Sequence, residues 1–186
     1  FAYDSGLHVP LVVRIPENWR DSVLHRRGTR TPGFVSFIDF GPTVIHLAGL
    51  RVPRQIDGRP FLGVEIPAKD LAARDGAFGY ADRFDEKYDQ VRTLRKGRYK
   101  YIRNYQAFYP DGLQNNYRYR MLAYAEWRQL NRQGMLNATQ RRFFEPRPPE
   151  QLFDIAEDPH EIENLAEEPD YAEILGDLRG RLRSRV

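Results

Sequence analysis

The sequence predicts a mixed α/β protein in two parts, 1–75 and 76–186, in which an antiparallel sheet and a C-terminal helix make up the second part. Two β-rich runs meet at Lys96-Gly97, the pattern of a tight hairpin turn. Apolar side chains recur at helical spacing from residue 171 to 183. A segment rich in proline and glycine, residues 51–75, separates these elements from the earlier ones and predicts the boundary.

The first part is expected to hold two short strands and one short helix. Residues 11–16, LVVRIP, form an apolar β-rich run closed by a proline, which is typical of a buried strand. Residues 34–40, FVSFIDF, indicate a second strand or extended segment. A proline in the first turn and a glycine at the end predict a helix over 41–50, with Asp39 or Thr43 serving its free N–H groups.

The second part is predicted to alternate short strands and helices. Its strands show β-rich composition bounded by turn residues, and its helices show apolar residues three or four positions apart. The expected elements are a strand at 76–81, a charged loop at 82–86, a hairpin over 91–105, helices at 113–133 and 138–144, a strand at 151–155 and a helix from 171 to 183.

Composition excludes several classes of protein. Hydrophobic residues make up 41% and charged residues 30%, with no apolar run of about 18 residues, which excludes a membrane-spanning helix and wholesale disorder. The chain has no cysteine, and therefore no disulfide, thiolate metal site or cysteine nucleophile. The net charge of +3 is too small for a dedicated nucleic-acid binder unless the charge is concentrated.

The first ten residues, FAYDSGLHVP, read as the middle of a fold. They contain no initiator methionine and no basic segment followed by an apolar one. A predicted buried strand follows them directly. We therefore expect further residues upstream of Phe1 in the complete protein.

The common catalytic templates are absent, and His8 is the histidine that stands out. The chain has no G-x-S-x-G, P-loop, H-E-x-x-H, G-x-G-x-x-G or EF-hand pattern. His8 lies in a glycine-containing turn before a predicted buried strand, where an imidazole can point into a cleft.

The loop Asp82-Arg83-Phe84-Asp85-Glu86 has two interpretations. It can be an ordinary solvated loop, because charged runs usually are. Alternatively, the guanidinium of Arg83 binds an anionic ester or a sugar carboxylate, while Asp82 or Glu86 holds it in place or accepts sugar hydroxyls. Spacing alone leaves both open.

The predicted hairpin is strongly basic and also carries tyrosines. Such a surface could bind single-stranded nucleic acid or an anionic glycan. The tyrosines, however, alternate in phase, as they do on the inner face of a half-buried strand, and we favour this structural interpretation. The basic residues, with no acid among them, are Arg92, Arg95, Lys96, Arg98, Lys100 and Arg103.

Five segments in series resemble one family. They are YDSGLHVPLVVRIP, SFIDFGPTVIHLAGL, IDGRPFLG, DRFDEKYDQVRTLRKGRYKYIRNY and QLFDIAEDPHEIENLA. Their order and separation resemble the C-terminal half of a type I, formylglycine-dependent sulfatase of the alkaline phosphatase superfamily, similar to bacterial heparan N-sulfatase-like and other glycan sulfatases. The resemblance implies that 1–75 is the tail of the catalytic α/β domain. It implies that 76–186 is a subdomain in which a four-stranded antiparallel sheet packs with a C-terminal helix.

The resemblance also implies an activity, the hydrolysis of a sulfate ester or N-sulfate of a sugar. Relatives use formylglycine and calcium, but this chain has no C/S-x-P-x-R motif, no Asp pair, no Asp-Asn metal segment and no sulfate-binding lysine. We therefore expect no catalytic residue and no metal ligand here, and no activity without the missing N-terminal catalytic region. The expected partners are that region and a sulfated substrate, with no nucleic acid and no membrane.

By resemblance, three residues bind substrate at the rim of the pocket. His8 would lie near the sulfate or the adjoining sugar, and Asp82 and Arg83 would lie in a loop that overhangs the pocket. Asp39 is assigned to helix capping, and Asn164 with Leu165 to a structural role. Two alternatives remain: a phosphonate or phosphate ester hydrolase of the same superfamily, and a non-catalytic module that binds anionic glycan or nucleic acid through residues 91–105.

Overall fold

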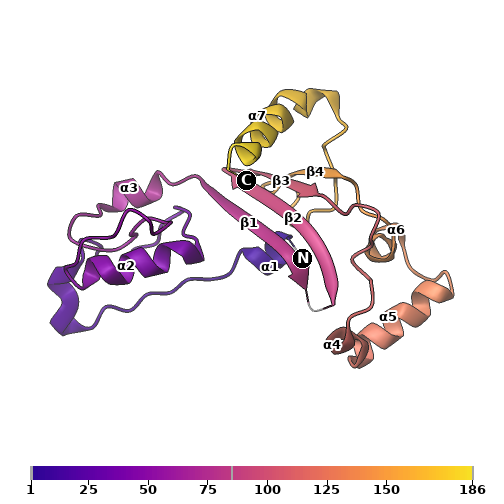
Figure 1. Ribbon diagram of the computed structural model, residues 1–186, viewed down its shortest axis with the longest axis horizontal. Helices are drawn as coiled ribbons and strands as arrows, with labels where there is room; N and C mark the ends of the chain where they lie inside the picture. Colours follow the sequence, from indigo (N-terminus) through magenta and orange to yellow (C-terminus); the bar gives the residue numbers. More distant parts are fainter. Residues whose placement is uncertain (1, 85, 186) are drawn as a thin grey trace. The chain divides into compact units, whose positions relative to one another are not determined.

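The computed structural model describes residues 2–84 and 86–185, which form two compact units. The helical unit comprises Pro10–Ala77, and the sheet unit comprises Phe1–Val9 together with Phe78–Val186. Figure 1 shows both units. The sequence pattern indicated a boundary near residue 75 but not that the first nine residues belong with the later part. The assignment of 1–75 to the tail of a catalytic domain stays a prediction.

The helical unit packs short helices around a small apolar core. Its buried side chains are Val23, Phe61, Leu62 and Leu71, with Ile15, Val35 and Leu47 partly buried beside them. Its elements are the 3-10 helices η1 (Glu17–Ser22) and η2 (Phe37–Asp39) and the helices α2 (Phe40–Leu47) and α3 (Ala68–Ala72).

The prediction of two strands in the first part is wrong. Residues 11–16 form no strand, and Val12 is 90% exposed. Residues 37–40 form η2 and begin α2 instead. A strand needs a neighbouring strand for its backbone hydrogen bonds. Residues 11–16 pair with no strand in the described part of the helical unit, and the N–H of Phe34 donates to the carbonyl oxygen of Arg74 at 2.9 Å without forming a strand. The predicted helix after them is confirmed as α2, and Gly49, with φ of +74°, lies just beyond its end.

Asp39 performs a capping role, but at η2 rather than at α2. Its Oδ2 accepts a hydrogen bond from the backbone N–H of Ser36 at 3.0 Å, which completes a capping box around η2. Its Oδ1 accepts from the N–H of Arg59 at 2.8 Å, and Arg74 Nη1 lies 3.6 Å from its Oδ2. Thr43 does not cap α2 either, because its Oγ1 accepts from the N–H of Phe61 at 3.1 Å. These contacts tie the start of α2 to the following loop.

The sheet unit contains the expected four-stranded sheet, and its strands lie in the order β1-β2-β3-β4. The strands are β1 (Gly76–Phe84), β2 (Lys87–Lys96), β3 (Tyr99–Asn104) and β4 (Glu150–Asp154). β2 pairs antiparallel with β3, and β3 with β4. Gly97 has φ of +54° in the turn between β2 and β3, a conformation that glycine adopts without strain.

The charged loop expected at 82–86 is mostly strand. β1 continues through Asp82 and Arg83 to Phe84, and β2 already begins at Lys87, while Asp85 lies outside the described residues. Charged side chains suit β1 because it is an edge strand, where they discourage pairing with other chains. The loop prediction was wrong because charge was read as a sign of irregular structure.

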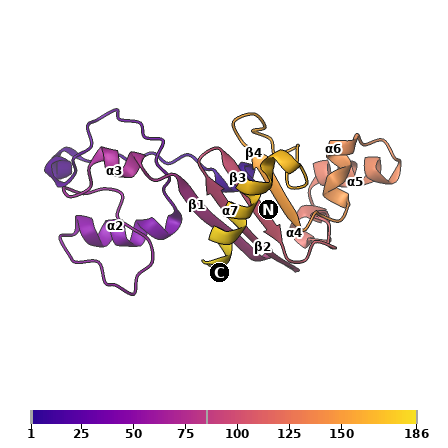
Figure 2. The same cartoon turned by 90° about the horizontal axis from the view of Figure 1, so that it is seen from above.

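Each face of the sheet has its own apolar core. On one face, three strand residues pack against helix α7 (Ala172–Arg183): the cluster is Leu94, Tyr101, Leu152, Leu175, Leu178 and Leu182. On the other face, the N-terminal segment packs against the sheet: the cluster is Ala2, Val91, Ile102 and Phe153, with Tyr3 partly buried. Figure 2 shows α7 lying across the strands. The first residues therefore complete the second face.

The region between β3 and β4 folds as three short helices. The predicted helix over 113–133 is interrupted, because Met121 is extended and divides α4 (Asn116–Tyr119) from α5 (Leu122–Arg132). The Asn115 side chain accepts from the N–H of Arg118 and caps α4. Beyond them lie α6 (Ala138–Arg141) and η3 (Arg142–Phe144), and η4 (Pro169–Tyr171) precedes α7.

Candidate functional site

His8 follows a one-turn helix, α1 (Asp4–Leu7), at the N-terminal edge of the sheet unit. Its backbone N–H donates to the carbonyl oxygen of Asp4 at 2.8 Å, which closes the turn. The side chain of His8 is exposed. The turn expected at His8 is present, but the buried strand expected after it is not, and the role of His8 with substrate stays a prediction.

A buried cluster of charges fixes this turn to the sheet. Asp4 Oδ1 lies 2.8 Å from Lys100 Nζ, and Asp4 Oδ2 lies 2.5 Å from Arg95 Nη1. The backbone N–H of Asp4 donates to Glu161 Oε2 at 2.6 Å. Glu161 Oε1 in turn lies 2.7 Å from Lys100 Nζ. We call Asp4, Arg95, Lys100 and Glu161 the anchor cluster.

Lys100 and Glu161 form the buried half of the anchor cluster, and Asp4 and Arg95 lie at its edge. The side chains of Lys100 and Glu161 are 1% and 2% exposed, whereas those of Asp4 and Arg95 are 12% and 20% exposed. Burial raises the pKa of Glu161, an effect that its hydrogen bond with Lys100 opposes. The two cations and two carboxylates balance, which makes burial of the Lys100–Glu161 pair tolerable.

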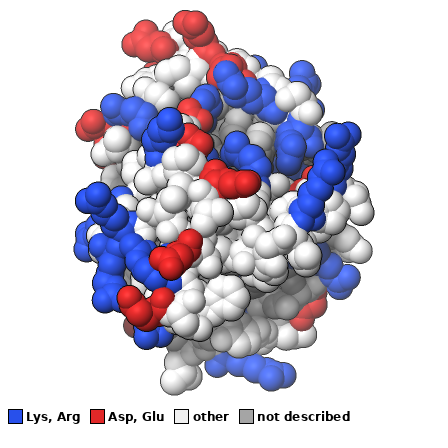
Figure 3. Space-filling view, turned by 90° about the vertical axis from the view of Figure 1, so that its left-hand side faces the viewer, with Lys and Arg blue, Asp and Glu red and all other residues white. Residues whose placement is uncertain are grey.

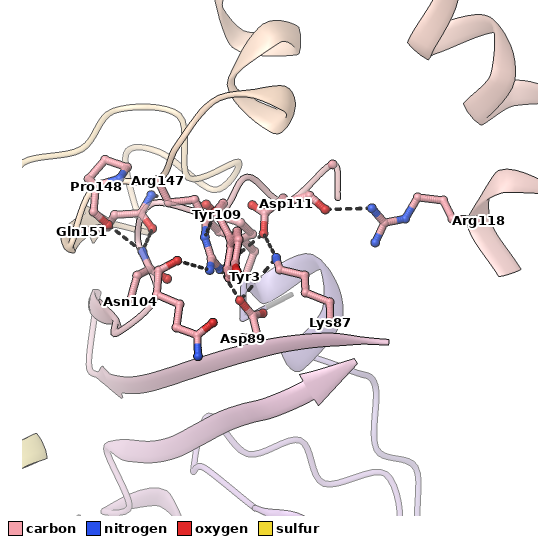
Figure 4. A network of polar contacts seen from close by, with 12 residues as sticks. Tyr3, Lys87, Asp89, Asn104, Tyr109, Asp111, Arg118, Arg147, Pro148 and Gln151 are labelled. Atoms are coloured by element: carbon pink, nitrogen blue, oxygen red, sulfur yellow. Dashed lines mark hydrogen bonds and ion pairs between the residues drawn. The ribbon is translucent and has the colours of Figure 1, made fainter. Parts of the chain in front are cut away.

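A second buried cluster lies at the other end of β2. Arg147 Nη1 is 2.6 Å from Asp89 Oδ1 and 3.5 Å from Asp111 Oδ1. Lys87 Nζ is 3.4 Å from Asp89 Oδ1 and 3.6 Å from Asp111 Oδ1. Figure 4 shows these side chains converging, with Tyr3 beside them. Burial lowers the pKa of Lys87 and raises those of Asp111 and Tyr3.

The second cluster organises the chain that leaves β3. Arg147 also donates to the carbonyl oxygens of Tyr109 and Gln106, at 3.1 and 3.2 Å. Asn104 Nδ2 donates to the carbonyl oxygen of Pro148 at 2.8 Å. These bonds hold the segments on either side of α4–α6 together (Figure 4). The cluster therefore contributes to holding this part of the fold together.

Asp82 and Arg83 lie next to each other in β1 but do not act as a pair. Asp82 Oδ1 is 2.5 Å from Arg92 Nη1, and the Asp82 side chain is 56% exposed. The guanidinium of Arg83 lies 5.2 Å from the centroid of the Tyr88 ring. Successive strand residues point to opposite faces. Asp82 therefore does not hold Arg83, as the loop interpretation had suggested, and substrate binding by either residue stays a prediction.

The basic hairpin is largely neutralised within the fold. Arg95 and Lys100 belong to the anchor cluster, and Arg98 Nε donates to Asp154 Oδ1 at 2.7 Å. Arg92 is paired with Asp82, and Arg103 Nη1 lies 3.8 Å from Glu150 Oε1. Figure 3 looks onto a different face, the left-hand side of Figure 1, where basic and acidic side chains are interspersed. The hairpin thus lacks the uncompensated charge that a polyanion-binding surface needs.

Sequence reasoning missed the anchor cluster, although one signal for it was present. Lys100 has the same strand parity as Ile102, a residue of the inward apolar face. A charged residue in an inward phase requires a buried partner. Asp4 and Glu161 are the partners of Lys100.

The structural role predicted for Asn164 is confirmed, because its Oδ1 accepts a hydrogen bond from the N–H of Leu152 at 2.9 Å.

Two shallow hollows lie away from the predicted site residues. One, of about 460 Å³, is lined by residues 51–55; the other, of about 380 Å³, lies beside Trp127 and Leu130. The described residues include no group of three or more His, Asp and Glu side chains that could hold a metal ion. Nor, in the ranges 2–84 and 86–185, does any helix have the length and apolar character that crossing a membrane requires.

Comparison with known proteins gives a consistent result. The family model for "N-sulphoglucosamine sulphohydrolase, C-terminal" matches residues 1–116. An "Ulvan-active sulfatase" of Formosa agariphila is 36% identical over 181 residues, which cover 97% of this chain and 29% of that protein. A second protein of that name from the same organism is 27% identical over 182 residues, which cover 92% of this chain and 31% of the relative.

A solved structure of a 2-O GAG sulfatase is similar to 79% of this chain, over 23% of its own length, at 21% sequence identity and a TM-score of 0.47. The chain therefore spans less than a third of the length of each of these proteins.

Proposed function

The chain belongs to the N-sulphoglucosamine sulphohydrolase C-terminal family, and from this we propose that it is the C-terminal part of a sulfatase that hydrolyses sulfate esters or N-sulfates of a sugar. The observation that carries the proposal is the family match over residues 1–116, which includes His8, Asp82 and Arg83. The similarity to two ulvan-active sulfatases over nearly the whole chain supports a sulfated polysaccharide unit as the substrate.

In this proposal the chain contributes the rim of the substrate pocket. The Arg83 guanidinium lies 5.2 Å from the centroid of the Tyr88 ring, within the range of a cation–π contact that favours particular orientations of its flat fork. A guanidinium in a fixed orientation can donate two parallel hydrogen bonds to sulfate or carboxylate oxygens. The exposed imidazole of His8, on its closed turn, supplies a further donor for a sulfate or a sugar hydroxyl.

The chemical step belongs to other parts of the complete protein. Formylglycine forms from a cysteine or serine in a C/S-x-P-x-R motif, and this chain has none. The described residues likewise offer no set of ligands that fits calcium. Neither group fits the residues present, and the role proposed for this chain is recognition.

The test is sulfate release by the complete protein, produced together with a formylglycine-generating enzyme. The substrates are ulvan oligosaccharides, glucosamine N-sulfate and, as the alternative, a phosphonate monoester. Sulfate released from a sulfated sugar supports the proposal. Turnover of the phosphonate ester alone would replace it with the phosphonate hydrolase alternative, and turnover of none of the three would overturn it.

A further inference from the structure

We propose that Lys100 and Glu161 are positioning residues for His8, acting through Asp4 to fix the turn that presents the imidazole to substrate. The inference rests on the proposed function. It adds that substrate recognition by His8 depends on Lys100 and Glu161, two residues that lie far from it in the sequence. Neither Lys100 nor Glu161 reaches the surface, so their contribution must pass through the turn.

The connection from Glu161 to His8 consists of two hydrogen bonds in series. Glu161 Oε2 accepts from the N–H of Asp4 at 2.6 Å, and the carbonyl oxygen of Asp4 accepts from the N–H of His8 at 2.8 Å. Both ends of the Asp4 backbone are therefore engaged. A shift of the Glu161 carboxylate moves the Tyr3–Asp4 peptide unit and, through the Asp4 Cα, the next peptide unit, whose carbonyl oxygen accepts from His8.

The turn depends on this anchorage because it is too short to hold itself. α1 has four residues, no side-chain cap and no buried residue. Isolated helices of this length are unstable in water, since nucleation costs more than one turn of hydrogen bonds returns. Its position on the sheet unit is instead set by the ion pairs of Asp4 with Lys100 and Arg95.

The ion pairs of the anchor cluster fix the orientation of the side chains that form them. A buried ion pair is often no more stable than apolar residues of similar volume, but it permits one arrangement of its members. Apolar contacts of the N-terminal segment are already provided by Ala2 and Tyr3. The charges lie one residue further along, where the turn begins.

Glu161 adopts a costly backbone conformation to take part. Its φ is +55°, a left-handed conformation that non-glycine residues rarely adopt. Asp158 stabilises the loop, because its Oδ2 accepts from the N–H groups of Ile162 at 2.6 Å and Glu163 at 2.8 Å. Such strain persists where the surrounding structure fixes a functional side chain. Here it directs the Glu161 carboxylate at Lys100 and the N–H of Asp4.

The decisive experiment is a double-mutant cycle in the complete protein. Lys100→Met and His8→Ala are made singly and together, and kcat and KM are measured on a sulfated sugar well below the melting temperature of every variant. Each single change is expected to lower kcat/KM at least tenfold, and the double variant to be no worse than His8→Ala, because residues that act through one another are not additive. If the loss of kcat/KM in the double variant equals the product of the losses in the two single variants, the proposal is overturned.

A matched control separates positioning from general loss of stability. Arg147→Met also removes a cation from a buried cluster, but one whose contacts hold the segments around α4–α6. Its effect on kcat/KM is expected to multiply with that of His8→Ala. Glu161→Gln, which keeps the acceptor for the Asp4 amide but loses the charge facing Lys100, should fall between wild type and Lys100→Met.

Amide hydrogen exchange provides a readout that needs no activity. In Lys100→Met the amides of residues 4–8 should exchange at least tenfold faster than in wild type, and in Arg147→Met they should not change. Unchanged protection in Lys100→Met overturns the positioning role. If the wild-type protein releases no sulfate, the proposed function fails, while the exchange result still decides whether the cluster anchors the turn.

Discussion

The backbone N–H of Asp4 is hydrogen-bonded to Oε2 of Glu161, 157 residues further along the chain, at 2.6 Å. This bond joins the segment before the helical unit to the loop after β4. The sheet unit is consequently assembled from two stretches of sequence, and its integrity depends on a small number of buried polar contacts between them.

Asp4→Ala should destabilise the sheet unit strongly. It leaves Lys100 buried with Glu161 as its remaining carboxylate and removes one carboxylate partner of Arg95. Breaking a buried pair costs about 3–5 kcal/mol, which urea denaturation of the chain would measure. Asp177→Ala, which breaks an exposed pair with Arg181 within α7, should cost about 0.5 kcal/mol or less. Equal losses in the two variants would contradict the anchoring role.

Glu150 should make the stability of the sheet unit dependent on acid pH. A hydrogen bond from Arg179, opposed by burial, lowers the Glu150 pKa from 4.5 to about 2. A depressed carboxyl pKa stabilises the fold above pH 4.5, and this contribution is lost as the pH falls toward 2. The difference in unfolding free energy between wild type and Glu150→Gln should shrink across that range. A difference independent of pH would refute this.

Arg83→Ala should impair the complete enzyme without affecting its folding. Loss of charged hydrogen bonds to the substrate is expected to lower kcat/KM by about 5- to 150-fold, which corresponds to about 1–3 kcal/mol. Arg141→Ala removes an arginine from an exposed pair with Glu145 and serves as the control. Turnover that is unchanged in Arg83→Ala, with the melting temperature retained, would exclude Arg83 from the pocket rim.

Two glycines with positive φ should differ sharply in their tolerance of alanine. At Gly97, where φ is +54° and the space around a Cβ is open, alanine should cost about 1–2 kcal/mol. At Gly58, where φ is +89°, a Cβ would lie 2.3 Å from the carbonyl oxygen of Ile38, and the cost should reach about 2–5 kcal/mol. Hydrogen exchange measures the loss of stability of the sheet unit in Gly97→Ala and of the helical unit in Gly58→Ala. Similar losses in the two variants would contradict the stated geometry.

Local patterns predicted the second part of the fold well. The hairpin at Lys96-Gly97 and the terminal helix depend on turn chemistry and periodicity within a few residues, and both are confirmed. The prediction for the first part failed where secondary structure depends on a tertiary partner. Residues 11–16 have the composition of a strand but no neighbour to pair with in the described helical unit.

The candidate site was predictable only in part. His8 could be selected from its turn, but the residues that hold the turn could not, because Asp4 meets Lys100 across 96 positions. For Asp82 and Arg83 the error was in secondary structure, since a strand sends neighbouring side chains to opposite faces and a loop does not. The residue types indicated which side chains could bind an anion. The alternation of side chains along the strands decided which of these side chains lie close together.

The discontinuous sheet unit has a consequence for biosynthesis. Asp4 leaves the ribosome before the strands that will receive it, and Glu161 is translated 157 residues later. Contacts of such long range form slowly, since the intervening chain must be ordered first. The anchor cluster therefore cannot form until translation has passed β4, and the segment that carries His8 is exposed to aggregation and proteolysis during that interval.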